Sequence, residues 1–204
     1  YSRLTQQQKY MMWLSLMVFI SALWSTILWL NVKNNLFIGH FYTVFQFLLI
    51  MKIYQLEFQS KTTKLILTIL MISFTVLAIL NTLFIQPLDV QNSNATTWRS
   101  ILLLFPIVGF FVKRVAKPKE SRIEKTPMFW FSSGALIYFL CTLIIFAISN
   151  SILPPKFVNF LPISVPIWIV HNVFMWIFFI LTTIAVWISP NPLNSLEKHS
   201  SSYI

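Results

Sequence analysis

The sequence predicts an all-α bundle of transmembrane helices, and three observations lead to that fold class. First, 57% of the 204 residues are hydrophobic, only 10% are charged, and the mean hydropathy is +0.74. A water-soluble domain of this size would have too few polar residues to cover its surface. Second, long stretches without charge recur along the chain. Third, the basic residues gather in alternate connecting segments. We therefore expect a single polytopic transmembrane domain over residues 1–204.

Six apolar stretches predict six membrane spans. A spanning helix needs about 20 mostly apolar residues, because its backbone amides must be hydrogen-bonded within the helix when they lie in hydrocarbon. The fourth stretch has only a dozen charge-free residues. We extend it outward through Trp98 and Arg99 and inward to Val115, since a terminal arginine can snorkel to the headgroups. The predicted spans cover about residues 11–30, 36–56, 65–85, 98–115, 128–150 and 165–188.

The distribution of positive charge predicts the orientation. Twelve of the 15 Lys and Arg residues lie on one side of the alternation, whereas Lys33, Arg99 and Lys156 lie on the other. The positive-inside rule then places both chain ends and the loops 57–64 and 113–127 in the cytoplasm. We expect a multi-pass protein of a bacterial inner membrane with its C-terminus inside. We attribute the net charge of +10 to basic residues that set the orientation in the membrane and contact anionic lipid headgroups. We therefore expect no nucleic-acid partner.

Polar residues inside the spans are the best candidates for a site, because burying them in a membrane is costly. Gln46 lies near the middle of the second span, and we expect it to face the bundle and to be hydrogen-bonded. Most of the others lie toward the outer ends of their spans, which predicts one outer-leaflet polar pocket. The residues assigned to this ligand pocket are His40, Tyr42, Gln46, Asn81, Tyr138, His171 and Asn172. Separate interhelical hydrogen bonds are the alternative.

Enzyme motifs are missing from the sequence, and it predicts a non-enzymatic protein. There is no HExxH, phosphate loop or GxSxG, and no acidic residue lies inside a span. The Ser-Ser-Gly run at 132–134 is interpreted as a close helix contact rather than as a nucleophile. A haem held axially by His40 and His171 is geometrically conceivable, although no CxxCH motif supports it, and no metal site is predicted. The single cysteine, Cys141, excludes an intrachain disulfide.

Four segments carry a resemblance to a bacterial protein family. They are residues 35–43 with Gln46 and Phe47, residues 81–87, residues 127–134 with Tyr138, and Trp168 with His171 and Asn172. Over about residues 10–188 their order resembles small polytopic inner-membrane proteins of Bacteroidota-type bacteria, which are often encoded near sensor kinases and have no assigned activity. The resemblance implies a glutamate in relatives at the position of Gln46. It also implies a further helix before residue 1, which would make seven spans.

These patterns favour a receptor-like or signalling-accessory membrane protein. It would sense a small or lipidic ligand in the outer-leaflet pocket and pass the change to a membrane-protein partner through loop 113–127. The basic residues expected to contact that partner or anionic lipid are Lys113, Arg114, Lys117, Lys119, Arg122 and Lys125. The alternatives are a structural subunit of a larger membrane complex, a small transporter and a haem-binding membrane protein. The transporter is disfavoured by the missing carboxylate and by the presence of only three glycines.

Overall fold

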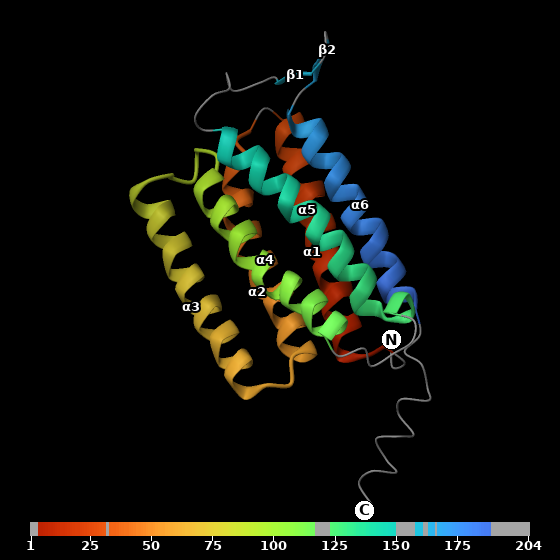
Figure 1. Cartoon of the computed structure of the whole chain (residues 1–204). Helices are drawn as coiled ribbons and strands as arrows, with labels where there is room; N and C mark the ends of the chain where they lie inside the picture. Colours follow the sequence, from red (N-terminus) through yellow and green to blue (C-terminus); the bar gives the residue numbers. More distant parts are fainter. Residues whose placement is uncertain are drawn as a thin grey trace, which may run out of the picture.

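The protein is an all-α helical bundle, as predicted (Figure 1). The structure is a computed structural model, and it describes residues 4–31, 33–116, 123–149, 158–160, 163–165 and 167–188. Within these ranges six helices are long and apolar enough to cross a membrane, so the chain is a multi-pass integral membrane protein. They are α1 (Gln6–Leu30), α2 (Leu36–Glu57), α3 (Lys61–Phe84), α4 (Ser93–Ala116), α5 (Pro127–Ser149) and α6 (Ile167–Trp187).

Polar capping turns lengthen several helices beyond their apolar stretches. In α1 the Thr5 hydroxyl accepts a hydrogen bond from the backbone N–H of Gln8, and the Gln8 side chain accepts one from the backbone N–H of Thr5. This reciprocal capping starts the helix five residues before the predicted span. Ser60 caps α3 in the same position. The helix α4 begins at Ser93, also five residues earlier than predicted, and this earlier start changes the surroundings of Arg99.

Helices α2 and α4 form the middle of the bundle. Helix α1 packs against α2 and α6, and α5 packs between α4 and α6 (Figure 1). Helix α3 lies at the edge, where it contacts α2 and α4, and it buries only Leu67, Phe74, Ala78 and Asn81. Leu70 and Met71 are partly buried against the core, and the remaining apolar residues of α3 are exposed, as expected for a helix whose outer face lies in lipid.

The two ends of the bundle differ in their connections. One end carries an antiparallel pair of short strands, β1 (Val158–Phe160) and β2 (Ile163–Val165), in the proline-rich connection between α5 and α6. The prolines of that connection lie outside the described residues. We call this the hairpin end, and it includes the start of α4. At the opposite end Gln8 donates hydrogen bonds to the carbonyls of Ala185, Val186 and Ile188, which fastens α1 to the last turn of α6.

Helices α5 and α6 approach each other closely at Gly134. A Cβ atom placed on Gly134 would lie 3.0 Å from Leu181 Cβ and 3.1 Å from Phe178 Cδ2. The neighbouring Ser132 hydroxyl lies 2.9 Å from the hydroxyl of Tyr54 and is fully buried. The interpretation of the 132–134 run as a close helix contact is therefore confirmed, because a side chain at Gly134 would push the helices apart.

A short 3-10 helix, η1 (Ile123–Lys125), precedes α5 at the end opposite the hairpin. Pro127 is the first residue of α5, where a missing backbone N–H costs no helical hydrogen bond.

Candidate functional site

A buried arginine is the feature that distinguishes the interior of this protein. Arg99 is 1% exposed and is among the largest fully buried side chains. We expected it to snorkel to the headgroups from the end of its span, and that expectation was wrong. Because α4 begins at Ser93, Arg99 lies six residues inside the helix, at a depth of about 9 Å for a rise of 1.5 Å per residue. Its side chain reaches between α2 and α5 instead of outward.

The contacts of Arg99 are neutral and aromatic. Its Nη1 donates a hydrogen bond to the side-chain carbonyl of Gln46. Its guanidinium carbon lies 5.5 Å from the ring centre of Phe139 and 5.9 Å from that of Tyr42, both within range of a cation–π interaction. Gln46 is itself fully buried, which confirms that it faces the bundle and is hydrogen-bonded.

No carboxylate compensates the charge of Arg99 in the described part of the chain. The one ion pair found there joins Arg114 and Glu57 near the opposite end of the bundle. The chain has only five acidic residues. Of these, Asp89 belongs to the connection at the hairpin end, and it is exposed. An unpaired charge in a low-dielectric interior is unfavourable by several kcal/mol, so this site requires a physical explanation.

Several polar atoms around Arg99 also lack hydrogen-bond partners. Arg99 Nε, the amide nitrogen of Gln46 and the hydroxyl of Thr142 are buried and unpaired. Thr142 follows Phe139 by three residues and lies on the same side of α5. The Tyr42 hydroxyl is near enough to Tyr138 to interact with it electrostatically, but it has no hydrogen-bond partner within 3.5 Å in the described part of the chain. Four unpaired polar atoms at one site are unusual, because nearly all buried polar groups in proteins are hydrogen-bonded.

The site continues toward α6 through an aromatic wall. The hydroxyl of Tyr138 lies 3.2 Å from His171 Nε2, and an electrostatic interaction connects His171 with Arg99. Tyr138 also stacks on Phe178, with 5.5 Å between ring centres and 6° between ring planes. We call Tyr42, Gln46, Arg99, Tyr138, Thr142 and His171 the Arg99 cluster. It combines an uncompensated cation with a flat apolar surface.

A second polar group lies between α3 and the start of α4. Asn81 donates hydrogen bonds to Gln86 and Asn92 and accepts one from Asn94, and Gln86 donates to Ser93. We call these five residues the amide network. Beside it, the two ring nitrogens of His40 lie 2.8 Å from the Thr82 hydroxyl and 3.0 Å from the carbonyl oxygen of Val90.

The residues of the predicted ligand pocket are thus distributed over both groups. Tyr42, Gln46, Tyr138 and His171 belong to the Arg99 cluster, whereas Asn81 belongs to the amide network and His40 lies next to it. Asn172 is exposed on α6 and interacts with His171. Within the described ranges, no group of three His, Cys, Asp or Glu residues could hold a metal ion.

Three of the basic residues expected to contact a partner, Lys113, Arg114 and Lys125, lie at the opposite end. Arg114 forms an ion pair of 3.1 Å with Glu57, and Lys113 lies 5.2 Å from the ring centre of Phe58. Lys125 is exposed on η1. Lys117, Lys119 and Arg122 lie outside the described residues.

Sequence reasoning missed Arg99 and Thr142 as members of a site. A signal for Arg99 was present in the spacing of its neighbours, because the small or apolar residues Ala95, Thr96 and Leu103 lie three or four positions from it and share its face. A helix that continues through these residues carries Arg99 inside the bundle. Comparisons with protein-family models, characterised proteins and solved structures find no match to this chain. The resemblance to the Bacteroidota-type proteins therefore stays a prediction.

Proposed function

We propose that this integral membrane protein is a receptor-like, non-enzymatic protein that binds a small organic anion in the Arg99 cluster. The observation that carries the proposal is the burial of Arg99 without a carboxylate partner. A carboxylate ligand would supply the missing negative charge. Its apolar body would pack against the aromatic wall of Tyr138 and Phe178, whose rings are parallel.

The geometry of the guanidinium supports a carboxylate in particular. Nη1 is already hydrogen-bonded to Gln46, whereas Nε and Nη2 have no hydrogen bond in the described part of the chain. These two nitrogens form one edge of the guanidinium, and such an edge binds a carboxylate through two parallel hydrogen bonds. The Thr142 hydroxyl and the Gln46 amide are further donors without partners.

Benzoate and benzamide offer a matched pair of probes, because they have nearly the same shape but only benzoate is charged. We expect benzoate to raise the melting temperature of the detergent-purified protein. At about 100 times its Kd, a ligand stabilises the folded state by about 2.7 kcal/mol, which corresponds to roughly 5–10 °C for a chain of this size. Benzamide should have a much smaller effect.

Two variants separate this site from unspecific anion binding. Arg99→Gln removes the buried charge and should abolish the benzoate response. Lys33→Gln removes an exposed cation near the same end of the bundle and should leave the response unchanged. If wild type shows no benzoate response, or if Arg99→Gln retains it, the proposal is wrong. The unpaired atoms would then be satisfied by buried water, as in a purely structural subunit.

We also infer that the hairpin end faces the outside of a bacterial inner membrane and that the C-terminus is cytoplasmic. The charge asymmetry supports this orientation, and it would let the ligand reach Arg99 from outside, about two helical turns from the start of α4. The test uses a Cys141→Ser background carrying either Val90→Cys or Ala116→Cys, both at exposed positions. A membrane-impermeant thiol reagent should label residue 90 in intact cells and spare residue 116. The reverse labelling would overturn the orientation.

A further inference from the structure

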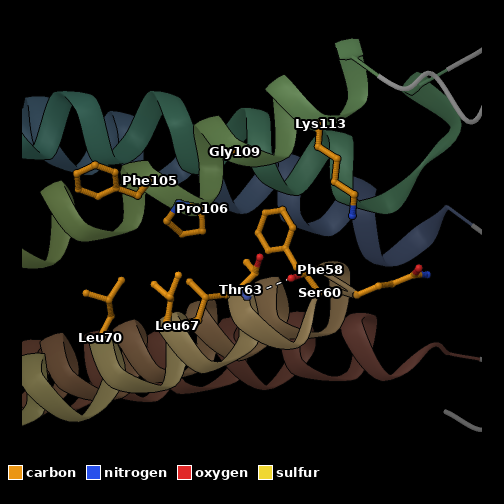
Figure 2. A pocket seen from close by; sticks show the side chains of 11 residues that line it. Phe58, Ser60, Thr63, Leu67, Leu70, Phe105, Pro106, Gly109 and Lys113 are labelled. Atoms are coloured by element: carbon orange, nitrogen blue, oxygen red, sulfur yellow. Dashed lines mark hydrogen bonds between the residues drawn. The ribbon is translucent and has the colours of Figure 1, made fainter.

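A groove separates α3 from α4 near the end opposite the hairpin, and its lining changes from polar to apolar along its length (Figure 2). Its volume is about 580 Å³, within the range of small-molecule sites. Ser60, Thr63 and Lys113 lie toward one end of it, and Leu70 and Phe105 lie toward the other. From Lys113 to Phe105 the groove follows eight residues of α4, or about 12 Å of helix.

Small residues create this space. Gly109 has no side chain, and a Cβ atom there would meet only the Phe58 ring, at 3.7 Å. Thr63 stands on the facing side of α3 (Figure 2). The rim is open, since Ile66 is 52% exposed and Phe105 is 67% exposed. In a bilayer this rim faces hydrocarbon, where a water-filled apolar groove would be unfavourable. An acyl chain is therefore the natural occupant of the apolar part.

The polar end of the groove carries positive charge. Lys113 makes no ion pair in the described part of the chain, because the carboxylate of Glu57 is bonded to Arg114 and Gln7. Its Nζ contacts the Glu57 backbone carbonyl at 3.4 Å and lies over the Phe58 ring, which holds it at the groove. The Ser60 hydroxyl accepts a hydrogen bond from the Thr63 N–H, so its own proton is available to a phosphate oxygen. Anions are also favoured beside the N-terminus of α3.

We propose that this groove binds one bilayer phospholipid with an anionic headgroup. The phosphate and headgroup would lie at Lys113 and Ser60, and one acyl chain would lie along Leu67, Leu70, Pro106 and Gly109. This site is separate from the Arg99 cluster, since Lys113 and Arg99 are 14 residues apart on α4, about 21 Å along the helix. Its test does not depend on the proposed anion-binding function.

The experiment is native mass spectrometry of the delipidated full chain in mild detergent, titrated with phosphatidylglycerol or with phosphatidylcholine. We expect one phosphatidylglycerol to bind preferentially to wild type. Lys113→Gln should weaken phosphatidylglycerol binding about fivefold, the contribution of one basic residue near anionic lipid, and leave phosphatidylcholine unchanged. Gly109→Leu should fill the groove and weaken both lipids.

Lys125→Gln is the matched control, because Lys125 is an exposed lysine at the same end of the bundle that does not line the groove. It should bind phosphatidylglycerol like wild type. Equal losses in Lys113→Gln and Lys125→Gln would show that only diffuse surface charge attracts the lipid. Full binding by Gly109→Leu, or no preferential binding by wild type, would also overturn the proposal.

Discussion

The amide network and the Arg99 cluster contain buried polar residues at the same half of the bundle, but they differ in how those residues are satisfied. In the amide network Asn81 makes hydrogen bonds through both its amide nitrogen and its carbonyl oxygen, and Gln86 does the same. None of its side-chain atoms is buried without a partner. In the Arg99 cluster four side-chain atoms are buried and unpaired, and one of them belongs to a cation.

This difference separates a structural polar group from a candidate binding site. A self-satisfied network stabilises the connection between α3 and α4 and leaves little capacity for a ligand. An incomplete one stores unfavourable electrostatic energy that a ligand of opposite charge can relieve. Substitutions in the two groups should therefore have opposite effects on stability.

Asn81→Leu should destabilise the protein most. The substitution removes three hydrogen bonds and leaves the buried side-chain oxygen of Asn92 without its donor, at a cost of roughly 2–4 kcal/mol. Unfolding in detergent, followed by circular dichroism, measures the change. Gln59→Leu, at an exposed position whose side chain makes no hydrogen bond in the described part of the chain, is the control and should cost less than about 1 kcal/mol. Equal losses in the two variants would contradict a structural role for the amide network.

Gly134→Ala should cost about 1–3 kcal/mol, because its new methyl group would overlap Leu181 and Phe178. The aromatic wall of the Arg99 cluster depends on this contact between α5 and α6. Gly39→Ala provides the comparison, since a Cβ atom there meets nothing within 4 Å and alanine favours the helix. It should be neutral or stabilising. If Gly134→Ala were as stable as wild type, α5 and α6 could move apart at little energetic cost, which would contradict the prediction.

Glu57→Gln should have the smallest effect, a loss of about 1 kcal/mol that decreases as salt is added. It removes the carboxylate from Arg114, whose ion pair is largely but not completely shielded from solvent. Arg114 is thus the compensated counterpart of Arg99 in this protein. Urea unfolding at low and high salt measures the effect. A loss that does not change with salt would contradict an electrostatic origin.

The six helices could be predicted from the sequence, because the length of each uncharged stretch and the alternation of basic loops indicate which segments lie in lipid and which lie in water. It predicted less well where each helix begins. Ser93 and Thr5 start their helices in polar segments that hydropathy assigns to loops. Because the predicted start of α4 was five residues too late, Arg99 was assigned to the membrane–water interface instead of the bundle interior. The central residue of the site was therefore missed.

Depth along the helices could be predicted, but lateral position could not. His40 and Tyr42 are two residues apart, and in an α-helix such neighbours point about 200° apart. His40 therefore faces Thr82 on α3, while Tyr42 faces Arg99 on α4. Gln46 follows Tyr42 by four residues and shares its face, which explains why these two predicted residues do meet at Arg99.

Gln46→Glu tests most directly whether Arg99 is an uncompensated cation that awaits an anion. The substitution places a carboxylate where the Gln46 amide already accepts the hydrogen bond of Arg99. We predict that the free energy of unfolding in detergent rises by about 2 kcal/mol, because the buried charge gains its partner, and that benzoate no longer raises the melting temperature. A fall in the free energy of unfolding, with the benzoate response intact, would contradict the account.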